Sequence, residues 1–407
     1  MDESAVAKKS KYRKLNEEQG RDAAAYNIDD LPEAILEHIL SFVPMKDAVR
    51  TCVLSKKWRY LWTSRPNLAL MEWRFSGREH FTNFVERVLV LRGSARMKRF
   101  NLDCDVLGDA SCVSLWVSTA VKRNVEECFV DLLDIQGNFI LPYCLFTCAT
   151  LTHLVLSIPG ALKLPSRIRL PNLKVLHLVN ITFVDECSTE QLLSSPVLEE
   201  LSIEECTWDN LGTLTICAPM LKFLTIRDED FDCSLIDPYS CRVSICGNNL
   251  ESLHCISPFL NDYQVLRSAD ELYLHLPIFP NLKSLEVGRL DLKCRVLVKL
   301  LHNSPHLEAL QCEEGIELPP NDEEDGAVLD LAPPCSGSHL RQIELFDLFP
   351  CEEKVRTLEL FLKHATVLEK LMICSCWLPV ERRIKEMFQE KLLETRCGLK
   401  RLEIAFS

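Results

Sequence analysis

The feature that most constrains this chain is a short apolar pattern that returns along most of its length. In each copy, apolar residues occupy relative positions 0, 3 and 5. The clearest copies are LTHLVL at residue 151, LKVLHL at 173, LEELSI at 198, LKFLTI at 221, LKSLEV at 282 and LEKLMI at 368. Looser copies begin at Met97, Val125, Leu250, Leu307, Leu340 and Leu399. A single unit of this size cannot bury its own leucines, so we expect the copies to stack on one another.

Two of the copies continue the pattern beyond position 5, with the residues Leu198, Leu201, Ile203, Cys206 and Trp208, and Leu368, Leu371, Ile373, Cys376 and Leu378. This longer pattern resembles the L-x-x-L-x-L-x-x-N/C-x-L signature of leucine-rich repeats. The resemblance implies one short parallel strand per copy in a curved sheet, with helices or turns on its convex side. Because successive copies start about 22 to 33 residues apart, we expect an irregular solenoid.

The net charge limits which classes of partner the chain can bind, and the cysteines indicate its redox compartment. The chain has 46 Lys and Arg against 59 Asp and Glu, a net charge of -13, which disfavours nucleic acid and anionic membranes as partners. Its 20 cysteines are scattered through apolar stretches, as in proteins of a reducing compartment. We find no signal peptide and no run of about eighteen apolar residues, and therefore expect an intracellular protein of the nucleus or cytoplasm.

The first residues form a basic tail. Residues 1–25 lack an apolar pattern, so we expect them to be disordered. A nuclear import receptor can read a basic cluster of the kind formed by Lys8, Lys9, Lys11, Arg13 and Lys14. The same cluster is also typical of a plain solvated tail.

Residues 26–66 predict three short helices. Asp30 is a candidate helix cap before Pro32, and apolar residues recur every fourth position at Leu31, Ile35, Ile39 and Val43. Pro44 ends this helix, a second helix carries Val49 and Val53, and a third carries Trp58, Leu61 and Trp62. About forty residues cannot bury apolar side chains on so many faces, so a partner is expected to cover some of them.

The stretches Ile28-Asp29-Asp30-Leu31-Pro32 and VLSKKWRYLW at residue 53 resemble an F-box. The resemblance implies docking on a Skp-family adaptor, which connects the module to a cullin and a RING subunit. By position in the motif, the adaptor-facing residues would be Leu31, Pro32, Ile35, Ile39, Val49, Val53 and Trp58. The alternative is a helical cap that packs on the segment that follows.

The expected fold is therefore α/β: a trihelical F-box followed by an irregular leucine-rich-repeat solenoid. Residues 67–96 are expected to form a connecting helical cap, since Phe81, Phe84, Val85, Val88 and Leu89 have helical spacing. The repeats would occupy residues 97–338. Residues 339–407 resemble the FBD region that ends many plant F-box proteins, and we expect them to continue the repeats.

Within each strand, offsets 3 and 5 are expected to face the core, which leaves offsets 2, 4 and 6 on the concave face. We predict that a protein substrate binds there to the apolar and histidine side chains of Phe129, Val155, Val175, His177, Val179 and Phe223. Acidic residues frame this patch, namely Glu127, Asp131, Glu200 and Glu204. Packing preference alone also places β-branched residues on strands, and that interpretation stays open here.

The sequence contains no motif of an enzyme active site, a phosphate-binding loop or a zinc site. We therefore predict no catalytic residue, no cofactor and no metal site, and we interpret His153 and His177 as polar surface. The predicted function is that of a substrate-recognition subunit of a Skp-cullin-F-box ubiquitin ligase. A non-degradative interaction scaffold is the alternative. A hormone or inositol-phosphate receptor would need a basic pocket, whereas the concave positions up to residue 227 carry only Arg99 and Arg227 as fixed cations.

Overall fold

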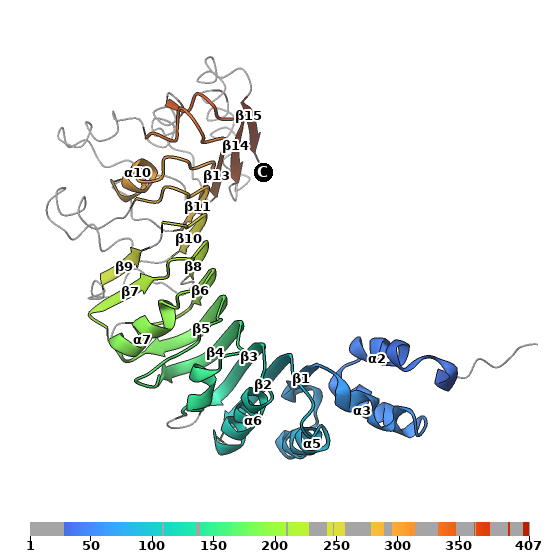
Figure 1. Ribbon diagram of the computed structural model, residues 1–407. Coiled ribbons are helices and arrows are strands. Elements are labelled where there is room, and N and C mark those ends of the chain that lie inside the picture. The colour runs from blue at the N-terminus through green and yellow to red at the C-terminus, as the bar shows by residue number, and fades with distance from the viewer. Residues whose placement is uncertain are drawn as a thin grey trace, which may run out of the picture.

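The computed structural model describes residues 28–107, 110–135, 139–208, 211–227, 242–246, 248–256, 278–288, 295–313, 333–346, 362, 364–374, 390 and 402–406. Over these residues the chain forms a long curved sheet that begins beside the front helices (Figure 1). The sheet has thirteen strands in the order β1-β2-β3-β4-β5-β6-β8-β10-β11-β12-β13-β14-β15. Every neighbouring pair in it is parallel, which confirms the α/β solenoid.

The strands follow the repeated apolar pattern closely. Their bounds are β1 Asn67–Met71, β2 Arg99–Leu107, β3 Glu127–Ile135, β4 His153–Leu162, β5 Val175–Phe183, β6 Glu200–Glu204, β8 Phe223–Arg227, β10 Ser252–Ile256, β11 Ser284–Val287, β12 Ala309–Cys312, β13 Gln342–Phe346, β14 Lys370–Cys374 and β15 Glu403–Phe406. From β2 to β14, each strand begins two residues after the first apolar residue of a copy. The last copy is shifted, because β15 begins at Glu403 and not two residues after Leu399.

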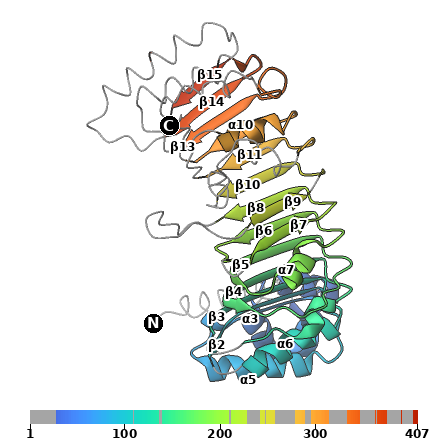
Figure 2. The ribbon, with the colours of Figure 1, turned by 90° about the vertical axis from the view of Figure 1, so that its left-hand side faces the viewer.

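The core lies between this sheet and an outer layer. Leu176 and Leu178 of β5, at offsets 3 and 5 of their copy, are fully buried. In the outer layer lie α5 (Arg78–Leu91), α6 (Ala110–Lys122), α7 (Glu186–Leu193) and α10 (Arg295–His302). Figure 2 looks onto this outer side and shows α6 and α7 in front of the strands.

The sheet begins one strand earlier than the sequence indicates. Residues 67–96 were expected to form a connecting helical cap, but β1 pairs with β2 in register, Leu68 beside Phe100 and Leu70 beside Leu102. The cause is the alternation in NLALM, which buries Leu68 and Leu70 on the core face of a strand. The expected helix follows as α5.

Short helices make up the front of the chain: η1 (Ile28–Asp30), α2 (Glu33–Ser41), α3 (Met45–Arg50), η2 (Thr51–Val53), α4 (Trp58–Leu61) and η3 (Trp62–Ser64). The expected cap at Asp30 is wrong, because the residue before α2 is Pro32 and no side chain caps that helix. Asp30 lies in η1 instead, one turn before the helix.

Two further features complete the described chain. Strands β7 (Thr213–Cys217) and β9 (Arg242–Cys246) form a separate parallel pair in the outer layer, near α7. The copies identified above do not include this pair. Strand β7 has the same apolar spacing, at Leu211, Leu214 and Ile216, but lies outside the long sheet, and the pattern before β9 lacks its first apolar residue. Among the described helices, none has the length and hydropathy needed to cross a membrane.

Candidate functional site

The front helices project from the β1 end of the sheet, toward its concave side (Figure 1). Helix α2 buries one stripe, Leu36 and Leu40, completely. A second stripe, one residue earlier in the helix, stays in solvent: Ile35 is 46% exposed and Ile39 is 37% exposed. Residues four apart lie on one helix face, so this second stripe is a continuous apolar strip.

The seven residues predicted to face an adaptor fall into three groups. Pro32, Ile35, Ile39 and Val53 are exposed, and Leu31 and Val49 are half-buried against the core. Trp58 does not fit the prediction, because it is only 2% exposed and its indole Nε1 donates to Asp29 Oδ1 at 3.1 Å. Its ring belongs to the core of the front helices.

Sequence reasoning missed several large exposed side chains here, among them Phe42, Leu54 and Tyr60. Phe42, at 76% exposed, follows Ile39 by three residues, and Leu54 and Tyr60 are also exposed. We use the name front apolar surface for Ile35, Ile39, Phe42, Val53 and Leu54. The signal for Phe42 was its helical spacing from Ile39, and the signal for Leu54 was its position beside Val53.

Three arginines connect the front helices to the solenoid through backbone carbonyls. Arg65 donates from Nη1 to Val43 O at 2.9 Å, and Arg92, which is 3% exposed, donates to the carbonyls of Trp62 and Arg65. Arg123 of the next repeat donates to Leu89 O at 2.6 Å. Burial lowers the pKa of Arg92 to about 10, and the nearby positive charges of Arg123 and Arg65 add to this effect. The bonds of Arg92 join the end of the front helices to the end of α5, and the bond of Arg123 joins α5 to the next repeat.

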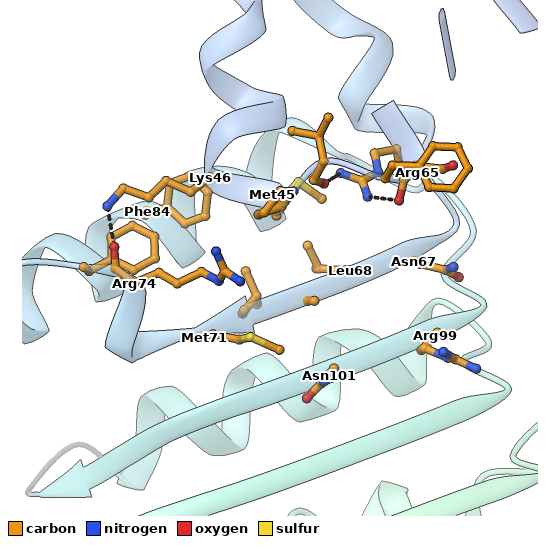
Figure 3. A pocket seen from close by; sticks show the side chains of 17 residues that line it. Met45, Lys46, Arg65, Asn67, Leu68, Met71, Arg74, Phe84, Arg99 and Asn101 are labelled. Carbon is orange, nitrogen blue, oxygen red and sulfur yellow. Dashed lines mark hydrogen bonds between the residues drawn. The ribbon is translucent and has the colours of Figure 1, made fainter. Parts of the chain in front are cut away.

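A cavity of about 330 Å³ lies in the corner between α3 and strands β1 and β2 (Figure 3). Its apolar side chains include Leu68, and its charged side chains are those of Lys46, Arg65, Arg74 and Arg99. The lining contains no carboxylate. None of the residues predicted to bind an adaptor or a substrate lines it.

The strand register brings the predicted substrate residues together. Phe129, Val155 and His177 are neighbours in one row across β3, β4 and β5. In the row beside it, Glu200 separates Val175 from Phe223, and Val179 lies two residues beyond His177 on β5. Phe223 is 47% exposed and the others are half-buried. These side chains therefore form one patch on the concave face, which we call the inner apolar patch.

Polar contacts border the patch on both sides. Arg99 lies over the ring of Phe129 at 5.3 Å and donates from Nε to Glu127 Oε2 at 2.6 Å. On the other side, His177 Nε2 lies 2.8 Å from Glu200 Oε1. The two histidines that the sequence places nearby do not face each other, because His153 pairs with Val175 and His177 with Val155.

Further along the concave face, His254, Glu286 and Glu313 offer ligand atoms within 4.8 Å of one another. Both ring nitrogens of His254 are engaged, Nδ1 with Glu286 Oε2 at 3.1 Å and Nε2 with Arg227 Nη2 at 3.3 Å. Burial lowers the pKa of His254, and Arg227 lowers it further. Because both ring nitrogens already have partners, neither is free to ligate a metal, and we interpret the group as a hydrogen-bonded network. Sequence reasoning missed this group because its members come from three different repeats.

Two family models match the chain. The F-box domain matches residues 28–70, which contain the front helices and β1. The LRR repeats of the FBD-associated F-box protein At5g56370 match residues 113–237, which contain strands β3 to β8. The matches thus cover the exposed apolar helices and the inner apolar patch.

Curated relatives from Arabidopsis thaliana combine an F-box and leucine-rich repeats (LRR) in their names. The F-box/LRR-repeat protein At3g26922 is 35% identical over half of this chain and 67% of its own length. The F-box/FBD/LRR-repeat protein At2g26030 is 28% identical over 85% of this chain and 91% of its own length. The putative F-box/LRR-repeat protein At3g49150 is 37% identical, but the match spans only 34% of its length.

Proposed function

Because this chain belongs to the plant F-box proteins with leucine-rich repeats, we propose that it is the substrate-recognition subunit of a Skp-cullin-F-box ubiquitin ligase. The front helices bind a Skp-family adaptor and, through it, a cullin and a RING subunit. The repeats bind the protein to be ubiquitinated. Transfer of ubiquitin is carried out by the other subunits, and this chain supplies no catalytic residue.

The observation that carries the proposal is the front apolar surface. Val53 is 83% exposed and Phe42 is 76% exposed, while the adjacent stripe of α2, Leu36 and Leu40, is completely buried. Apolar surface of this extent on the helices of a folded protein is typical of a protein interface. The surface lies at the end of the molecule that matches the F-box domain.

The second support is the separation of the two surfaces. The inner apolar patch lies on strands β3 to β8, away from the front helices at the β1 end (Figure 1). An adaptor on the front helices therefore leaves the patch available for another protein. The proposal also places the protein in the nucleus or cytoplasm, where the adaptor and the cullin would meet it.

Co-purification of the full chain with a Skp-family adaptor and a cullin tests the adaptor step. We expect Val53→Asp and Ile39→Asp to abolish recovery of both partners, because each change places a charge in an apolar interface. The matched control is Val90→Asp, since Val90 is 77% exposed but lies on α5, outside the F-box match. Full recovery of both partners with Val53→Asp and Ile39→Asp would refute the docking surface.

The substrate step is tested by comparing protein abundance in cells. Proteins that bind the repeats and become more abundant with both proteasome inhibition and Val53→Asp are the expected substrates. A set of bound proteins whose abundance responds to neither treatment would instead identify a non-degradative scaffold.

A further inference from the structure

The concave face carries far more acidic than basic side chains. At the inward positions of the described strands and, for Glu313, directly after β12, the acidic residues are Asp103, Asp105, Glu127, Asp131, Glu200, Glu204, Glu286, Glu313, Glu344 and Glu403. The basic residues at these positions are Arg99, Arg227 and Lys370. The face is thus acidic well beyond what the overall composition requires.

The acidic residues lie on both sides of the inner apolar patch. On the side nearer the front helices, Asp103 and Asp131 are direct neighbours across β2 and β3. Burial raises the pKa of Asp103, and the charge of Asp131 raises it further. Two like charges held this close destabilise each other, so a positive charge between them lowers the electrostatic free energy.

On the far side, glutamates from β11, β12 and β13 gather in the same way. The pKa of Glu286 is raised by burial first, then by Glu313 and, more weakly, by Glu344, while the charge of Arg227 offsets part of this rise. The chain's own Lys and Arg side chains neutralise only part of this negative charge. Lys370 Nζ lies 3.4 Å from Glu344 Oε1, whereas in the described part of the chain Asp131 and Glu313 form no ion pair with a Lys or Arg.

Between the two acidic groups lies the inner apolar patch. Phe129 and Val155 lie side by side on β3 and β4, and the side chain of Phe223 is about half exposed. Apolar side chains of a partner would bury this surface. Neighbouring strands are about 4.8 Å apart, so the six steps from β3 to β11 span roughly 30 Å, the length of about nine extended residues.

From this arrangement we propose that the concave face binds a basic segment of the substrate, in which apolar residues are flanked on both sides by Lys or Arg. The proposal rests on the proposed function, because it names the class of substrate that the repeats recognise. The central side chains contact the inner apolar patch. The flanking cations pair with Asp103 and Asp131 at one end and with Glu286 and Glu313 at the other.

The test selects peptides from a displayed pool of random 12-residue sequences with the immobilised full chain. We expect enriched peptides to carry Lys or Arg on both sides of an apolar centre, and Asp and Glu to be depleted. Their affinity should decrease with rising salt, because exposed charge pairs are screened.

A double variant shows whether the selected peptides bind this face. Asp131→Asn with Glu313→Gln neutralises one carboxylate on each side of the patch. The matched control is Glu86→Gln with Glu190→Gln, two exposed carboxylates on the outer helices α5 and α7. We expect several-fold weaker binding and a smaller salt dependence only in the first variant, with no loss of thermal stability in either.

Each outcome bears on the proposal. Selection of acidic peptides, of peptides without a charge preference or of none at all would overturn it, as would equal weakening by both double variants. The adaptor experiment is independent of this test. If basic peptides are selected but no adaptor is recovered, the peptide specificity stands and the ligase role is refuted. If the adaptor is recovered but no basic peptides are selected, the ligase role stands and the basic segment is refuted.

Discussion

At the scale of single residues, Asp29 joins several parts of the front helices through hydrogen bonds. Its Oδ1 accepts from the Trp58 indole at 3.1 Å and from the Ser55 hydroxyl at 2.9 Å. Lys57 adds a bond from Nζ to the Asp29 carbonyl at 2.7 Å. These contacts help to hold Trp58 in the core of the front helices.

Asp29→Ala should therefore weaken the front helices. The change leaves the buried Trp58 N–H without its acceptor, and we expect a loss of about 1–3 kcal/mol in the free energy of local opening. Hydrogen exchange of the amides in α3 and α4 measures it. Asp30→Ala is the control, because Asp30 is exposed, and equal losses in the two variants would contradict the assigned role.

A buried thiol leads to a prediction at alkaline pH. Burial raises the pKa of Cys128 to about 12, and Cys148 contributes further. Between pH 9 and 11 the thiol ionises in the unfolded chain but stays neutral in the folded one, so the free energy of unfolding falls with pH. The limiting slope for one such group is about 1.4 kcal/mol per pH unit.

The measurement compares urea unfolding between pH 9 and 11 in two variants. Cys128→Ala removes this thiol and should make the fall shallower by about 1 kcal/mol per pH unit. Cys187→Ala, at an exposed site, should leave the slope of the parent protein unchanged. Identical slopes in both variants would show that Cys128 ionises while folded.

At the scale of elements, the sequence predicted the strands far better than the helices and the surfaces. The positions 0, 3 and 5 located every strand from β2 to β14 of the long sheet, because strand side chains alternate strictly and Leu154 and Leu156 must both reach the core. The same rule failed at β1, where NLALM is a strand without the preceding leucine.

The surfaces were predictable only in part, because each surface group is made of side chains from several different repeats. The inner apolar patch could be listed from offsets alone, since the copies align in register. The group of His254, Glu286 and Glu313 and the cavity beside α3 could not. Both depend on residues that are distant in the sequence, and no local pattern encodes how closely they approach.

Adjacent residues of β5 should respond very differently to truncation. Leu178 is fully buried, and Leu178→Ala should lower the free energy of unfolding by about 2–5 kcal/mol through lost burial and a cavity. Val179 faces the concave side and is half-buried, so Val179→Ala should change it by less than about 1 kcal/mol. Urea unfolding followed by circular dichroism separates the two, and similar losses would contradict the strand's orientation.

At the scale of the whole molecule, the arginines between the front helices and the solenoid determine how the two parts are held. Arg92 directly follows α5, and its side chain donates hydrogen bonds to the carbonyls of Trp62 and Arg65 at the end of the front helices. If the adaptor and the substrate bind where we propose, this contact also fixes the position of one relative to the other.

Arg92→Ala should loosen this connection. The two buried carbonyls lose a charged donor, and we expect about 2–3 kcal/mol less protection in residues 58–66. Hydrogen exchange of that segment measures the loss, with the exposed Arg87→Ala on the same helix as control. Unchanged protection in Arg92→Ala would mean that apolar packing alone holds the junction.

The strand register described above also determines which changes of length the fold tolerates. The chain takes 22 residues from His153 to its neighbour Val175 but 33 from Ala309 to Gln342, and both pairs are aligned side by side. The register is therefore kept between copies of unequal spacing. Insertions or deletions in the connections between strands can accumulate without altering the concave face, whereas one residue added inside a strand would turn every following side chain to the opposite side. Homologues of unequal length can therefore present their concave side chains in the same geometry.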